Sequence, residues 1–246
     1  MSRMLTDAVR GLRPAWGERH GPLPALLLTL TVVTGLVDAV SYLGLGRVFV
    51  GNMTGNVVFL GFALGGTAGL SALASVVALG AFLAGAVAGG RLADRYATHR
   101  GHLLRAATGL QTVLVAVTVA VAAVQDTPMT PAVRYTLIVF LGLAMGLQTA
   151  VARRLAVPDL TTTVLTQTLT GLAADTPGGG EPSRPARRLL SVLAMFAGAL
   201  VGAALVLHGH LVAALALTLV LLAATCGAVH RLSAGEAAWV RPEQKA

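Results

Sequence analysis

Few side chains in this sequence are charged. Charged residues make up 11% of the 246 residues and aromatic residues 4%, whereas 55% are hydrophobic and the mean hydropathy is +0.77. A chain of this composition has too little polar surface to cover a water-soluble globule. The composition therefore excludes a soluble domain of any size and predicts a protein whose solvent is lipid, with the bilayer as its main partner.

Cysteine is almost absent as well. Cys226 stands alone in the last apolar run, so no intramolecular disulfide can form, and no residues match the spacing of thiolate metal ligands. The sequence also lacks an HExxH motif and a Ser/His/Asp catalytic pattern. We therefore expect no metal, no cofactor, no catalytic residues and no enzymatic activity.

Positive charge exceeds negative charge, with a net charge of +8. The chain has no basic and aromatic module of the kind that binds nucleic acid, so we expect no nucleic-acid partner. Instead, the arginines flank the apolar runs, where Lys and Arg orient membrane helices.

Six apolar runs have the ~20-residue length that crosses a bilayer core, which predicts an all-α integral membrane protein with six transmembrane helices. If all six cross, 16 of the 18 Lys and Arg residues lie on one side, and Arg47 and Arg134 lie on the other. Both termini are then expected in the cytoplasm. We expect a basic N-terminal tail (1–23), a single membrane domain (24–230) and a C-terminal tail (231–246). The six runs are residues 25–43, 72–90, 103–124, 135–152, 189–207 and 211–229.

Two polar segments interrupt this pattern, and we interpret them as short re-entrant or half-helical segments. Non-helical backbone at membrane depth survives only inside protein or beside water, where its groups are available to a ligand. Asn52 and Asp159 stand at expected helix N-caps, so that each short helix would point its positive end inward. Alternatively, the threonines satisfy neighbouring carbonyls within the bundle, and two further full spans would also fit the length. The candidate ligand-binding side chains are Asn52, Thr54 and Asn56 in the first segment, and Thr162, Thr163, Thr166, Gln167 and Thr168 in the second.

The two halves of the chain also align with each other. Residues 35–40 match residues 146–151 at an offset of 111, and the glycines of 85–89 match those of 198–202 at an offset of 113. This predicts two repeats, at about 24–125 and 134–230. Because each repeat crosses the membrane three times, the second must be inverted, an arrangement typical of secondary transporters. The GxxxG motifs favour close helix packing, and their exposed glycines would permit a homodimer.

Asp38 is the only acidic residue well inside a predicted span. A carboxylate at that depth costs ~3 kcal/mol or more unless it is paired, hydrated or protonated. We expect it to carry a coupling proton or to bind a cationic group, although it could instead pair with Arg47 or hydrogen-bond to Ser41 and Tyr42. Its counterpart in the second repeat is Thr149, with Gln148 beside it; both are candidate site residues.

Together these features favour a secondary transporter of an unknown small molecule, with Asp38 as the candidate for proton coupling. A membrane scaffold or assembly protein without transport activity is the alternative, and a membrane-embedded enzyme is a further one. The sequence does not decide whether the substrate is anionic, cationic or neutral.

Particular motifs resemble the YoaK family of bacterial membrane proteins, also called the DUF1275 family. They are the run LTVVTGLVDAVSYL at 30–43, NMTGN at 52–56, GLQTA at 146–150 and LTTTVLT at 160–166. The resemblance covers about residues 24–230, although Thr149 and Gln167 stand where the family is expected to have Asn and Gly. It implies a six-helix protein of the bacterial plasma membrane and brings no established biochemical activity.

Overall fold

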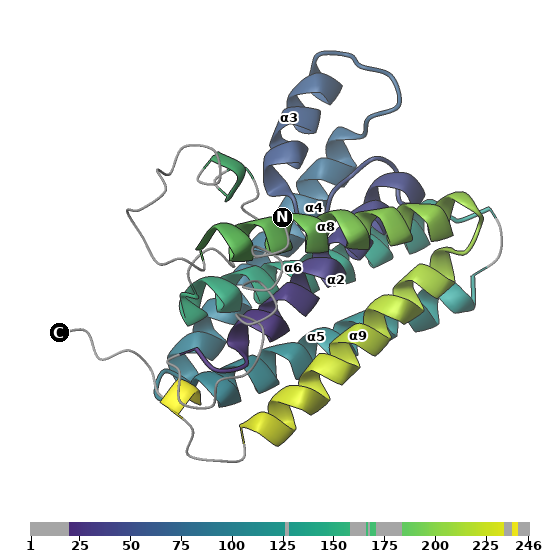
Figure 1. The fold of residues 1–246 in the computed structure, drawn as a ribbon. Helices are drawn as coiled ribbons and strands as arrows, with labels where there is room; N and C mark the ends of the chain where they lie inside the picture. Colours follow the sequence, from purple (N-terminus) through teal and green to yellow (C-terminus); the bar gives the residue numbers. More distant parts are fainter. Residues whose placement is uncertain are drawn as a thin grey trace.

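The computed structural model of the protein describes residues 20–125, 128–157, 166, 168–170, 184–233 and 238–240. Over these residues the regular structure is entirely helical (Figure 1). Six helices are long and apolar enough to cross a bilayer, which confirms the six predicted spans. They are α2 (Leu23–Gly44), α4 (Ala72–Arg95), α5 (Arg100–Ala123), α6 (Pro131–Leu155), α8 (Arg184–Leu207) and α9 (Leu211–Leu232).

Short-range signals in the sequence set where several helices begin. Ser71 caps α4, because its hydroxyl accepts a hydrogen bond from the backbone N–H of Ala74 at 3.1 Å. Thr130 caps α6 in the same way, and Pro131 follows at the first helical position, where its missing N–H costs nothing. Such caps satisfy amides that have no partner within the helix.

α2 and α8 pack in parallel at very close range through glycines. A Cβ built on Gly35 would overlap the carbonyl oxygen of Met195 and lie 2.7 Å from the backbone nitrogen of Ala199. A Cβ on Gly198 would overlap the carbonyl oxygen of Val32, and one on Gly202 would lie 3.0 Å from that of Leu36. Only residues without a side chain allow the two backbones to approach this closely.

α4 and α6 pack in the same manner. A Cβ on Gly146 would overlap the carbonyl oxygen of Phe82, one on Gly85 would overlap that of Leu143, and one on Gly89 would lie 2.9 Å from that of Leu147. The four glycines of the two GxxxG motifs are therefore buried inside one chain. The expectation that they are exposed and available for a homodimer was wrong, because intramolecular helix packing already uses them.

One end of the helix bundle is rich in arginine. At this end α5 packs antiparallel to both α6 and α9: Arg100 donates a hydrogen bond to the carbonyl oxygen of Leu155, and Arg105 lies 3.1 Å from Nδ1 of His230. Trp239, in the short 3₁₀ helix η1 (Ala238–Val240), is fully buried against this end. The described arginine side chains at this end are Arg91, Arg95, Arg100, Arg105, Arg153, Arg154, Arg187, Arg188 and Arg231.

The short helix α3 (Met53–Leu64) stands away from the other helices and packs on α4 (Figure 1). Its 12 residues span ~18 Å, too little to cross a core of ~30 Å. The chain leaves α2 and enters α4 at the same end of the bundle, since a Cβ on Gly69 before α4 would lie 3.0 Å from the Arg47 guanidinium after α2. The first polar segment is therefore a short helix that does not cross. Most of the second segment lies outside the described residues.

Candidate functional site

Four polar residues of α2 form a buried stripe along an otherwise apolar helix. Their spacing of three, four and three residues places them on one face, directed toward the other helices. All four are nearly inaccessible; even the carboxylate residue Asp38 is only 5% exposed. The stripe consists of Thr31, Thr34, Asp38 and Ser41.

A cluster of side-chain amides, which we call the amide cluster, joins α2, α5 and α6. Nε2 of Gln111 donates a hydrogen bond of 2.7 Å to Oε1 of Gln148. Nε2 of Gln148 in turn donates to Oγ1 of Thr34 at 2.9 Å and to the carbonyl oxygen of Leu30 at 3.3 Å. Both donor hydrogens of Gln148 are therefore used. All three side chains are buried among apolar residues, where an unpaired amide would be costly.

The space beside the amide cluster is closed in this conformation. Leu27 and Leu30 of α2, Leu104 and Ala107 of α5, and Val151 of α6 surround it, and no volume remains for a water molecule. The amides consequently bond to one another. A ligand would reach them only if α5 and α6 moved apart.

Asp38 holds the linker between α2 and α3. Its Oδ1 accepts hydrogen bonds from the backbone N–H groups of Gly51 at 2.8 Å and of Val50 at 3.3 Å. The hydroxyl of Ser41 donates to the main-chain oxygen of Asp38, not to its carboxylate. The linker thus reaches a residue six positions before the end of α2, ~9 Å along the helix axis. The carboxylate faces the positive end of α3, so the two neutralise each other.

Glycine at position 51 makes this approach possible. A Cβ there would lie 3.1 Å from Cγ2 of Thr34 and 3.2 Å from the nearer carboxylate oxygen of Asp38. Both contacts are tighter than ordinary side-chain packing allows. Thr34 therefore contacts the linker on one side and Gln148 on the other, and it connects Asp38 to the amide cluster.

The asparagines of the first polar segment hold the same linker in place. Asn56 is fully buried; its Oδ1 accepts from the N–H of Phe49 at 2.9 Å and its Nδ2 donates to the Phe49 carbonyl at 2.6 Å. Asn52 is the N-cap of α3, as predicted, and accepts from the N–H of Gly55 at 3.5 Å. Thr54 is exposed. The Asn56 amide is thus committed to the fold in this conformation.

The residues predicted in the second half come together less completely. Thr149, which lies 111 positions after Asp38, buries a hydroxyl that has no hydrogen-bond partner among the described residues. Thr166 is exposed and Thr168 is half-buried, both in helical conformation. Thr162, Thr163 and Gln167 lie outside the described residues.

Sequence analysis missed Thr34 and Gln111. Thr34 stands one helical turn before Asp38, so the three-and-four spacing of polar residues in α2 was the signal that could have identified it. Gln111 is an uncharged amide in an apolar run, a residue expensive to bury without a partner. Its sequence gives no sign that the partner is Gln148.

Comparison with known proteins agrees with this architecture. The family described as "Protein of unknown function (DUF1275)" matches residues 26–228. Over 153 residues the chain is 33% identical to the "UPF0700 transmembrane protein YoaK" of Bacillus subtilis (strain 168), an alignment that covers 62% of this chain and 67% of that relative. No solved structure matches the chain.

Proposed function

The chain belongs to the DUF1275 family of membrane proteins, and we propose that it is a secondary transporter of a small polar molecule that binds at the amide cluster of Thr34, Gln111 and Gln148. In this proposal two inverted three-helix repeats, α2–α4–α5 and α6–α8–α9, open the cluster alternately to the two sides of the plasma membrane. Both termini lie in the cytoplasm, and no catalytic step is involved.

The observation that carries the proposal is the matched glycine packing of the two halves. Gly35 contacts Met195 as Gly146 contacts Phe82; the α2 and α6 glycines are 111 residues apart, and their α8 and α4 partners 113. The contacts of Gly198 with Val32 and of Gly85 with Leu143 repeat these two offsets. Equivalent residues making equivalent contacts support two structural repeats, and three crossings in each repeat give opposite orientations.

Asp38 provides a route for proton coupling. As a carboxylate it accepts the N–H groups of Val50 and Gly51. A proton on it would remove the charge that strengthens these bonds and weaken its hold on the linker before α3. We propose that protonation releases this linker and favours the opening of the bundle beside Thr34.

The environment of the cluster favours a neutral polar substrate. Gln111, Gln148 and Thr34 offer amide and hydroxyl groups, which donate and accept hydrogen bonds without carrying charge. Asp38 is already paired with the N-terminal end of α3, so neither the carboxylate nor the positive helix end is left to bind an ion. This pairing separates the three substrate charges that the sequence left open.

A thermal-shift screen of the detergent-purified protein tests the binding step. The compounds would include neutral polyols, amides and zwitterions, together with organic cations and anions. A binding compound at 100 times its Kd stabilises the native state by ~2.7 kcal/mol. We expect neutral polar compounds to stabilise the wild type and to lose their effect in Gln148→Leu.

Thr118→Val is the matched control, because Thr118 is an equally buried α5 hydroxyl that bonds within its own helix to Leu114. Uptake of the labelled compound into proteoliposomes then tests transport: a pH gradient should drive accumulation by the wild type but not by Asp38→Asn. Binding unaffected by Gln148→Leu would place the site elsewhere. Binding without uptake would favour the scaffold alternative.

A further inference from the structure

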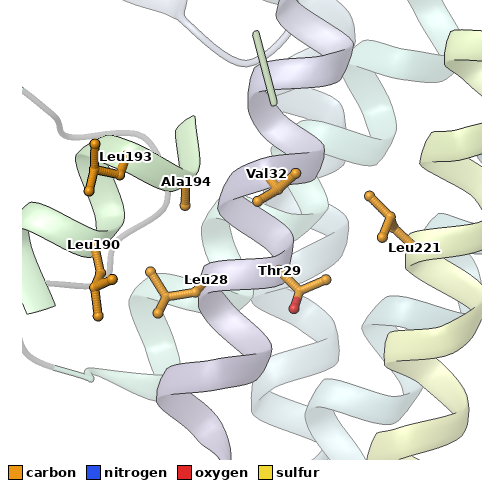
Figure 2. A pocket seen from close by; sticks show the side chains of 7 residues that line it. All are labelled: Leu28, Thr29, Val32, Leu190, Leu193, Ala194 and Leu221. Carbon is orange, nitrogen blue, oxygen red and sulfur yellow. The ribbon is translucent and has the colours of Figure 1, made fainter. Parts of the chain in front are cut away.

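An apolar groove opens between α8 and α9. The two helices meet at the turn around Gly209 and diverge from it (Figure 1). Figure 2 shows α2 between them, with Leu28 and Val32 at the base of the groove, Leu190 and Leu193 on the α8 side, and Leu221 on the α9 side. The groove has a volume of about 450 Å³. It faces sideways out of the helix bundle, toward lipid.

The same face of α9 continues from this groove to the arginine-rich end. Ala224 and Ala228 follow Leu221 at intervals of three and four residues, which places them along one stripe of the helix. Together with Gly227 and Arg231 they line a second hollow of about 490 Å³. The path from Leu221 to Arg231 is ~15 Å long, about half of the ~30 Å hydrocarbon core and hence the depth of one leaflet.

The charge at this end is strongly positive. Nine described arginine side chains lie there, whereas Asp94 is the one carboxylate among the described residues of that end, and it pairs with Arg154 at 3.5 Å. Arg231 is exposed at the end of the hollow, and Arg187 and Arg188 precede the groove residues of α8. Anionic headgroups are attracted to arginines at this level of a membrane.

We propose that the groove between α8 and α9 binds one anionic phospholipid, with an acyl chain along Leu221, Ala224 and Ala228 and the phosphate on Arg231. A second copy of the chain fits the face less well. Two protomers related by an axis along the membrane normal would bring their Arg231 side chains and neighbouring arginines to the same level, where like charges repel.

Native mass spectrometry of the full-length protein tests the proposal, with phosphatidylglycerol and phosphatidylcholine of identical acyl chains as probes. We expect one phosphatidylglycerol to be retained in preference to phosphatidylcholine. Arg231→Gln should weaken that retention about fivefold, the effect of one basic residue near the headgroups. Gly227→Leu should abolish it by filling the hollow.

Gly80→Leu on α4 is the control for Gly227→Leu, because a Cβ at either glycine would have no neighbour within 4 Å, so both variants should fold. Arg91→Gln, at the same end, is the control for charge. Equal retention of the two lipids, or equal effects of the two leucine variants, would overturn the proposal. So would a wild-type dimer that Gly227→Leu converts to a monomer, since the occupant would then be a second copy.

Discussion

Nε2 of Gln148 lies 2.9 Å from the hydroxyl oxygen of Thr34, a residue 114 positions earlier in the chain. This bond joins α2 to α6, the helices at equivalent positions in the two proposed repeats, which otherwise contact each other little. Through the 2.7 Å bond of Gln148 to Gln111 it extends to α5. A polar connection among three apolar helices restrains their relative positions and would have to change for the bundle to open.

The amide pair should show energetic coupling. Gln148→Leu leaves the buried amide of Gln111 without this partner, at an expected cost of ~1–3 kcal/mol. Gln111→Leu should cost a similar amount. The double variant should lose less than the sum, since neither buried amide then remains, with a coupling of ~0.5–1.7 kcal/mol. Unfolding in mixed micelles measures all three values, and strict additivity would contradict the pairing.

The glycine contacts should be equally sensitive in both halves. Gly35→Ala and Gly146→Ala each place a methyl group against a backbone carbonyl oxygen, of Met195 and Phe82 respectively. Overpacking of this kind costs ~1–3 kcal/mol. Gly80→Ala, which meets nothing within 4 Å, should be neutral or stabilising by up to ~1 kcal/mol because alanine favours helix. Thermal unfolding of the three variants compares them; destabilisation of only one half would argue against equivalent repeats.

Asp38→Asn should loosen the linker before α3 while leaving the six long helices intact. The substitution retains an acceptor oxygen but loses the charge, which roughly halves the strength of the bonds to Val50 and Gly51. We expect hydrogen exchange at these two amides to accelerate about tenfold, since a loss of ~1.4 kcal/mol is a factor of ten in an opening equilibrium.

Asp94→Asn is the control for the Asp38 experiment, because Asp94 is exposed at the opposite end, where it pairs with Arg154. It should leave exchange at the linker unchanged. Unaltered exchange in Asp38→Asn as well would mean that the carboxylate does not hold the linker.

The arginine-rich end should lose stability in acid through His99. Nδ1 of His99 caps α5 by accepting the N–H of His102 at 3.1 Å, and the two rings stack with centroids 3.7 Å apart. Partial burial, followed by the proximity of His102, lowers the pKa of His99 below its usual value. The unfolded chain therefore binds the proton more readily, so the stabilisation is complete above pH ~6.5 and is lost as the pH falls below it.

His99→Asn should remove that pH dependence, because asparagine is a good N-cap that does not titrate. The wild type and this variant should unfold at similar temperatures at pH 8, and the wild type should fall further than the variant at pH 5.5. Parallel pH profiles would show that His99 does not contribute to the acid sensitivity.

Much of the fold could be predicted because membrane insertion depends on local sequence. Runs of apolar residues specify the six spans, and the N-cap Asn52 follows from its own side chain and the amide three residues later. The spacing of glycines also indicated close helix packing. It did not indicate that the packing is internal, since a GxxxG motif is the same in a monomer and in a dimer.

The sequence by itself determined that the protein is a six-helix membrane protein with a polar, non-crossing segment after the first span and with its arginines concentrated at one end. Tertiary structure alone decided that Asp38 meets Val50 and Gly51, and that Gln148 meets Gln111 and Thr34. The physical reason is that helical periodicity tells which face a side chain occupies, whereas its partner depends on how separate helices are arranged in space.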